Sequence, residues 1–195
     1  MTKITDISQL DLNKSYTVAD YLNWQFDEMV ELIKGKIFKM SPAPRNYHQV
    51  ISSNLIYNLV NITKKTKCKA YHAPFDVYLN GIDKLSNTVV QPDICIVCDP
   101  TKIEDRGCVG APDLIVEIIS PSTMKKDLDY KYHLYEENGV REYWIIMPEY
   151  KQILVYVLDM ETNKYMHVGD FGVEDKVPVH IFDGITLDAD FIFNN

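Results

Sequence analysis

Apolar residues recur with a helical period in two stretches of the chain. In residues 47–65 they return every three or four positions and form one face, which predicts a helix packed on a core. The apolar face consists of Ile51, Leu55, Leu59 and Ile62. A second helix is predicted over residues 125–140, KKDLDYKYHLYEENGV, and Gly139 is suited to its C-terminal cap.

The N-terminal part predicts a short helix and a hairpin. At TVADYLNW, Thr17 can cap the first turn and Asp20 occupies the position of a capping-box acid. ELIKGKIFKM, residues 31–40, consists of two short extended runs that meet at Lys34-Gly35. Glycine accepts the positive φ that a tight turn requires, so we expect a β-hairpin there.

Several further segments have the apolar pattern of strands. Two of them, VVQPDICIVCD and APDLIVEIIS, are apolar on both faces, which is typical of central strands covered on both sides. KAYHAPFDVYL alternates like a single strand. The remaining segments are REYWIIMP and KQILVYVLD, a pair joined by a proline-containing turn, and the short strands KYMHVGD and IFDGITLD.

The order of these elements is helix, three strands, helix, strand, with β additions at both ends. This order predicts an α/β (α+β) fold, a mixed β-sheet flanked by helices, with extra β-hairpins at both ends. The 195 residues contain no internal repeat, low-complexity tract or long linker. We therefore expect a single domain over residues 1–195 with its core at about 45–150.

Composition narrows the class of protein. With 46% hydrophobic and 25% charged residues, the chain has the balance of a soluble globular protein. It has no apolar run of membrane-spanning length and no apolar signal core at its N-terminus, so we expect a cytoplasmic protein without a membrane partner. The net charge of −8 argues against coating nucleic acid by phosphate neutralisation alone, but a local site for cations would itself be acidic.

The four cysteines include the C-x-x-C pair of ICIVCD. Because positions three apart on a strand point to opposite faces, these two thiols could not easily share a metal ion. We expect all four cysteines to be small buried side chains in a reducing compartment.

Three charged residues stand among apolar neighbours. Asp93 and Glu117 lie within the two predicted central strands, and Lys131 lies on the apolar stripe of the second long helix. The other members of that stripe are Met124, Leu128 and Tyr135. A lone buried charge is costly, so the simplest arrangement brings the three together. They would form either an active centre or a purely structural ion cluster.

Two other acids have simpler explanations. Asp113 has the same strand parity as Glu117, but it follows Pro112 and suits the start of a strand or a turn. Asp127 precedes Lys131 by four residues, the spacing of a helix salt bridge. Such a bridge would explain a surface lysine, but not one flanked by apolar residues.

A Pro-Asp on one strand, an acid on the next and a lysine close behind resemble the PD-(D/E)xK nuclease superfamily. More narrowly, the stretch from about Glu31 to Tyr156 is similar to the Uma-two family of restriction-endonuclease-like proteins. The matching phrases are ELIKGKIFKMSPAPRNYHQ, APFDVYL, VVQPDICIVCDP, GAPDLIVEIISPST, KKDLDYKYHLYEENGVREYWIIMP and ILVYVL. They cover about two thirds of the chain in the family's order.

The resemblance implies roles for individual residues. It makes Asp93 the motif aspartate and Glu117 the acid of the (D/E)xK element, both as ligands of Mg²⁺ or Mn²⁺. Ile119 occupies the usual lysine position, so Lys131 from the neighbouring helix would replace that lysine. Lys131 would orient the attacking water or offset charge in the transition state.

Three more residues are candidates for the same site. Glu31 and His48 match positions that the family also presents; alternatively, Glu31 is a solvated hairpin residue and His48 a hydrogen-bonded core histidine. Gln91 lies two residues before Asp93 and shares its face of the strand, so it could reach a metal-bound water or a neighbouring backbone group.

The resemblance implies a Mg²⁺-dependent endonuclease that hydrolyses DNA phosphodiester bonds. Two alternatives stay open: an interaction module that keeps the fold without catalysis, and a hydrolase of another phosphodiester. Strands in the final third could pair across a two-fold axis, which makes a homodimer a candidate assembly.

Overall fold

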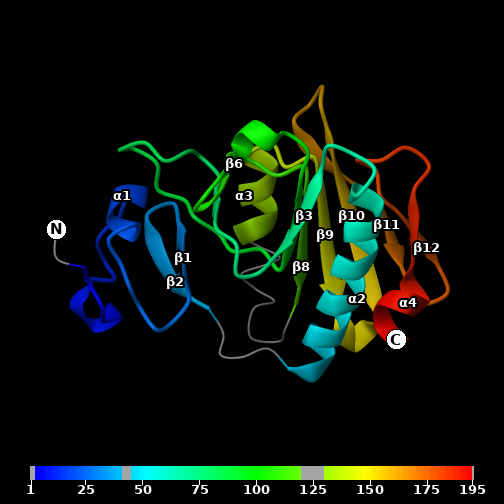
Figure 1. Ribbon diagram of the computed structural model, residues 1–195, viewed down its shortest axis with the longest axis horizontal. Coiled ribbons are helices and arrows are strands. Elements are labelled where there is room, and N and C mark those ends of the chain that lie inside the picture. Colours follow the sequence, from blue (N-terminus) through cyan, green and yellow to red (C-terminus); the bar gives the residue numbers. More distant parts are fainter. Residues whose placement is uncertain (1–2, 41–44, 120–129, 195) are drawn as a thin grey trace.

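A computed structural model describes residues 3–40, 45–119 and 130–194. Its framework is a six-stranded sheet in the order β11-β10-β9-β8-β5-β3 (Figure 1). β8 and β9 run parallel and all other neighbours run antiparallel, so the sheet is mixed as predicted. The strands are β3 (Lys69–His72), β5 (Ile94–Val97), β8 (Leu114–Ile118), β9 (Glu142–Met147), β10 (Gln152–Asp159) and β11 (Lys164–Phe171).

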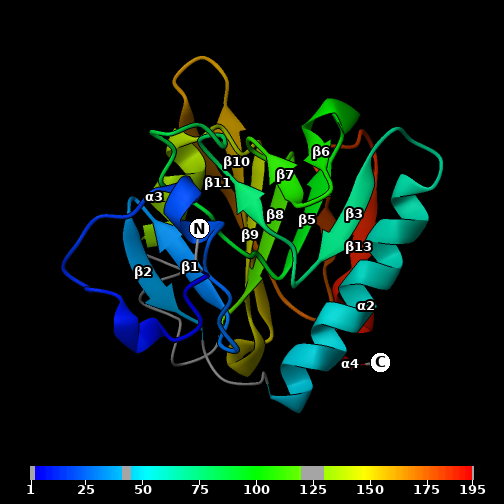
Figure 2. The ribbon, with the colours of Figure 1, turned by 60° about the vertical axis from the view of Figure 1, so that its left-hand side comes forward.

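Helices cover both faces of this sheet (Figure 2). α2 (Asn46–Thr63) and α4 (Ala189–Asn194) pack on one face, where Ile51, Leu55 and Leu59 of α2 are buried. α3 (Tyr132–Glu137) packs on the other face through Leu134 and Tyr135. Because alternate residues of β5 and β8 point to the two faces, both central strands are buried completely.

The N-terminal region adds a capped helix and a hairpin. α1 (Val18–Tyr21) begins with the predicted capping box between Thr17 and Asp20. β1 (Val30–Ile33) pairs with β2 (Lys36–Lys39) through a turn in which Gly35 has φ +79°. The positive φ favours glycine, and a Cβ atom there would lie 2.1 Å from Ser15 Oγ, so the Ser15 side chain would have to move.

Smaller elements complete the fold. β4 (Val77–Tyr78), β7 (Gly107–Val109) and β6 (Ile103–Glu104) form a three-stranded sheet. β12 (Lys176–Pro178) and β13 (Thr186–Asp188) form the C-terminal hairpin. Short 3₁₀ turns occupy Ile7–Gln9, Pro100–Lys102 and Pro148–Tyr150. The predicted fold class, a mixed sheet flanked by helices with hairpins at both ends, is confirmed.

One predicted strand is wrong, one short helix was not predicted, and the start of one predicted helix lies outside the described residues. KAYHAPFDVYL is not one strand, because β3 and β4 belong to different sheets on either side of Pro74, which has no N–H for a ladder. The residues of α4 were not predicted as a helix. The start of the predicted helix at 125–140, with Met124, Asp127 and Leu128, lies outside the described residues.

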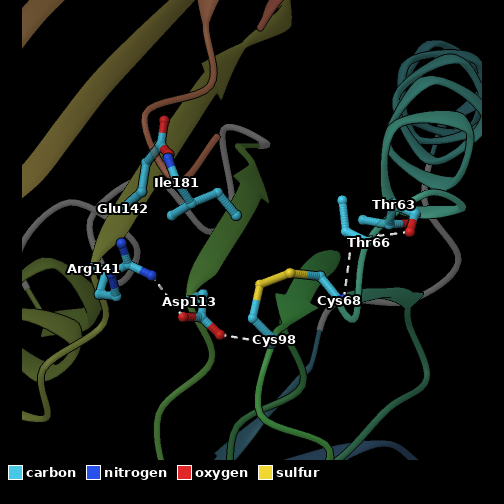
Figure 3. Close-up of a disulfide and its surroundings, with 8 residues drawn as sticks. All are labelled: Thr63, Thr66, Cys68, Cys98, Asp113, Arg141, Glu142 and Ile181. Carbon is cyan, nitrogen blue, oxygen red and sulfur yellow. Dashed lines mark hydrogen bonds and ion pairs between the residues drawn. A yellow bond between two sulfur atoms is a disulfide. The ribbon is translucent and has the colours of Figure 1, made fainter. Parts of the chain in front are cut away.

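The cysteine prediction was wrong for one pair. Cys68 and Cys98 form a disulfide that joins the start of β3 to the end of β5 (Figure 3). They lie opposite each other because β3 and β5 are antiparallel, with Lys69 beside Val97. Cys95 and Cys108 are free and buried as expected. No helix in the described ranges is long and apolar enough to cross a membrane.

Candidate active site

Lys131 is almost completely buried, and its counter-charges are two glutamates. It directly precedes α3 and is 2% exposed. Its Nζ lies 2.7 Å from Oε1 of Glu117 in β8 and 3.0 Å from Oε1 of Glu31 in β1. An ammonium shared by two buried carboxylates balances charges that would otherwise be costly to remove from water.

Local structure accounts for this convergence. Glu117 shares its face of β8 with Ile115 and Ile119, the face that α3 covers. The hairpin is held to the core because Leu32 exchanges backbone hydrogen bonds with Val89, which brings Glu31 close to the segment that leads into β5. Glu31 is fully buried, so its interpretation as a solvated hairpin residue is wrong.

Each of the two glutamate oxygens that contact Lys131 accepts a second hydrogen bond. The phenol of Tyr135 donates to Glu117 Oε1 over 2.6 Å, and the backbone N–H of Gln91 donates to Glu31 Oε1 over 3.0 Å. Burial, followed by the negative charges of Glu117 and Glu31, raises the pKa of Tyr135 well above its ordinary value. Tyr135 therefore remains a neutral donor at neutral pH.

Tyr135 was not predicted as a site residue. It follows Lys131 by four positions, one helical turn, and was placed only on the apolar stripe. The signal that could have found it is the combination of a phenol and an ammonium on one buried helix face, since both need a polar partner there.

Asp93 lies immediately before β5, at the same end of the sheet as Glu117. Its Oδ2 accepts a 2.7 Å hydrogen bond from the backbone N–H of Ile118, and its Oδ1 lies 3.2 Å from His48 Nε2. Both side chains are mostly buried, with 20% of Asp93 and 15% of His48 exposed. The structure thus brings His48 to Asp93 and brings Glu31, together with Glu117, to Lys131.

The side chain of Gln91 belongs to an adjoining polar network. Its Nε2 donates to Asp76 Oδ1 over 2.7 Å, and that carboxylate also accepts from the phenols of Tyr21 and Tyr78 at 3.1 Å each. Burial raises the pKa of both tyrosines, with the Asp76 charge as the next cause. Gln91 contacts the Lys131 cluster through its backbone, while its side chain is directed to Asp76.

The donor set suits a hard divalent cation. Asp93, Glu117 and Glu31 supply three carboxylates: those of Glu117 and Glu31 contact the ammonium of Lys131, and that of Asp93 contacts the imidazole of His48. Within the described ranges, no three His, Cys, Asp or Glu side chains are already grouped to hold an ion. Mg²⁺ commonly uses only one or two carboxylates together with waters and phosphate oxygens, so Asp93 and Glu117 fit that mode. Asp127 lies outside the described residues.

Comparisons with known proteins identify the family of the chain and a structure with the same fold. The family model "Uma2: Putative restriction endonuclease" matches residues 18–190. An uncharacterized protein of Synechocystis sp. is 28% identical over 180 residues, which cover 86% of this chain and 92% of that protein. The crystal structure of a protein from Anabaena variabilis, described as a putative nuclease belonging to DUF820, has a TM-score of 0.72. It is 20% identical and the match covers 91% of this chain and 97% of that one, a likeness that shows the fold.

Proposed function

The chain belongs to the Uma2 family, and from that premise we propose that it is an endonuclease that hydrolyses DNA phosphodiester bonds with Mg²⁺ or Mn²⁺. One observation carries the proposal beyond the family description: a buried ammonium and two buried acids meet at the end of the sheet where Asp93 also lies. Acidic side chains beside a lysine suit the chemistry of phosphoryl transfer, which needs charge stabilisation rather than a protein nucleophile.

In this proposal Asp93 and Glu117 would hold the cation, while His48 and the Ile118 N–H orient the Asp93 carboxylate. The bound ion would polarise the scissile phosphate and lower the pKa of the attacking water. Lys131 would orient that water or offset charge on the phosphate in the transition state. Glu31 would keep the ammonium in the site when no substrate is present.

DNA cleavage by purified protein with Mg²⁺ or Mn²⁺ tests the proposal. We expect Asp93→Ala to abolish cleavage, because one of two proposed ligands is lost. Asp113→Ala is the matched control, since Asp113 lies at the opposite end of the neighbouring strand and pairs with Arg141. The proposal fails if the wild type cuts no DNA substrate, or if Asp93→Ala cuts as well as Asp113→Ala.

The alternative is an interaction module that uses the charge cluster only for structure. The observation in its favour is that Lys131 already compensates both Glu31 and Glu117. Calorimetric titration with Mn²⁺ separates the two functions. An active centre binds the ion and loses binding in Glu117→Gln, whereas a structural cluster binds none and that substitution costs about 3–5 kcal/mol of stability.

The substrate needs its own test. A hydrolase of another phosphodiester would use the same residues, so competition between DNA, RNA and small nucleotides is the discriminating measurement. DNA is proposed because the family is described as restriction endonucleases. Inhibition of small-nucleotide hydrolysis by DNA, with DNA itself left intact, would contradict it.

We further propose that the chain is a single domain and works as a homodimer, because cleavage of both strands of a duplex is served by two centres. β11 is an edge strand of the six-stranded sheet and exposes Met166 and Val168. Light scattering tests the dimer.

We also propose a cytoplasmic location. Thiol labelling in cells tests it, because a reducing compartment would open the Cys68–Cys98 disulfide and leave both thiols free to react; a disulfide that stays closed in cells would contradict it.

A further inference from the structure

In the proposed mechanism Lys131 cannot stay bonded to both glutamates and also contact the substrate. In the structure its ammonium is bonded to Glu117 and Glu31, with about 3% of the side chain exposed. To act on substrate, the same ammonium must turn toward the phosphate or the attacking water. Leaving a buried carboxylate oxygen without a donor is costly, so this turn would displace Glu117 unless another group held it.

Tyr135 is placed to be that group. Its phenol donates to the same oxygen, Glu117 Oε1, that receives the lysine ammonium. The bond is 2.6 Å long, and Tyr135 is fully buried with its ring 5.0 Å from the ring of Tyr143, edge to face. A ring packed in this way has little freedom, so its hydroxyl stays directed at Glu117 when Lys131 moves.

Glu31 also has a second donor that does not depend on Lys131. Glu31 Oε1 accepts from the backbone N–H of Gln91 as well as from Lys131. A backbone donor in the segment that leads into β5 cannot follow the lysine. Both oxygens that Lys131 contacts therefore keep a fixed donor when the ammonium leaves.

We propose that Tyr135 is a positioning residue that holds Glu117 in its ligand geometry while Lys131 turns from Glu117 to the substrate. The inference rests on the proposed nuclease function. Tyr135 contacts neither substrate nor cation in this account; it acts through Glu117. Groups that orient metal-ligating side chains in this way typically change metal affinity or activity by about 10- to 100-fold when removed.

Tyr165 provides a matched control. It is a buried tyrosine whose ring also flanks Tyr143, at 6.1 Å, and its phenol donates one hydrogen bond, to the carbonyl oxygen of Val140. Tyr135→Phe and Tyr165→Phe each remove one buried hydroxyl from the same aromatic cluster. Only Tyr135→Phe removes a donor from Glu117.

The experiment compares the two variants in crystal structures of the metal-free protein, in Mn²⁺ affinity by calorimetry and in kcat for DNA cleavage. We expect the Glu117 carboxylate to shift or to adopt two conformers in Tyr135→Phe only. We also expect Mn²⁺ affinity and kcat to fall about 10-fold or more in that variant, relative to Tyr165→Phe. In a Lys131→Met background the loss of Mn²⁺ affinity caused by Tyr135→Phe should be larger, because Oε1 of Glu117 then loses the phenol as well as the ammonium.

Each contrary result has a separate meaning. An unmoved Glu117 carboxylate in Tyr135→Phe, equal Mn²⁺ affinities of the two phenylalanine variants, or the same loss in both lysine backgrounds overturns the positioning role while leaving an active wild type as a nuclease. A wild-type protein that binds no Mn²⁺ and cuts no DNA overturns the proposed function, and the positioning role with it.

Discussion

The acids at the two ends of the central strands have different kinds of partner. At one end, Glu117 in β8 contacts the buried ammonium of Lys131, and Asp93 before β5 accepts from the backbone N–H of Ile118, the residue after Glu117. At the other end, Asp113 before β8 accepts from the backbone N–H of Cys98 and pairs with Arg141, whose side chain is 52% exposed (Figure 3). A backbone donor and a surface cation explain Asp113 through structure alone. The other end buries a lysine between two acids, and this difference directs the functional proposal to the Glu117 end.

The largest difference is expected when each end loses its cation. Lys131→Met leaves Glu31 and Glu117 buried beside an uncharged side chain, which should lower the free energy of unfolding by about 3–5 kcal/mol. Arg141→Met removes a partly exposed partner of Asp113 and should cost about 0–1 kcal/mol. Urea unfolding of both variants measures the contrast, and equal losses would show that the two ends do not differ.

Opening the disulfide should affect only the stability of the end that contains it. The bond closes a sequence separation of 30 residues, so Cys98→Ser should lower the free energy of unfolding by about 2–4 kcal/mol. Mn²⁺ affinity should stay at the wild-type value, because Cys98 and Asp93 lie at opposite ends of β5. Calorimetry beside urea unfolding checks both statements, and a weakened Mn²⁺ site would mean that the ends are coupled.

A smaller, pH-dependent effect is expected from Glu142, which lies with Asp113 at the disulfide end. Its two carboxylate oxygens accept hydrogen bonds from Trp144 Nε1 and from the backbone N–H of Ile181, and burial raises its pKa above the ordinary 4.5. The raised pKa favours the protonated form in the folded protein. Its contribution to stability is therefore fully present below pH 4.5 and is lost as the pH rises through the folded pKa.

Glu142→Gln tests this assignment. The NH₂ group of the glutamine side chain would face either Trp144 Nε1–H or the Ile181 N–H, and two donors cannot bond to each other. We therefore expect the free energy of unfolding to fall by about 1–3 kcal/mol, most at low pH and less as the pH rises. Urea unfolding of the wild type and the variant across pH 4–8 gives the difference. A difference that grows with pH would contradict the raised pKa.

The sequence predicted the scaffold because apolar periodicity records which faces are buried. α2, the first hairpin and the central strands followed directly from that pattern. α4 was not predicted because its six residues are too few to show a helical period. The single strand predicted at KAYHAPFDVYL is divided at Pro74 into β3 and β4. The disulfide was not predicted because the pairing of Cys68 with Cys98 depends on the register of β3 against β5, which the pattern of apolar residues does not reveal.

The site was predictable only in part. A lysine on an apolar stripe indicated that Lys131 would need a buried counter-charge, and its contact with Glu117 fits that expectation. The approach of Glu31 depends on how the first hairpin docks beside Val89, a tertiary contact without a local signal. Tyr135 was hidden because a tyrosine on an apolar face resembles any other core residue until its hydroxyl partner is known.

A crystal structure of the protein soaked in Mn²⁺ tests the central claim most directly. Anomalous scattering should place the ion between the carboxylates of Asp93 and Glu117, with Tyr135 still bonded to Glu117. Density for Mn²⁺ elsewhere, or an unchanged Lys131–Glu117 pair with no ion beside it at saturating Mn²⁺, would contradict the account.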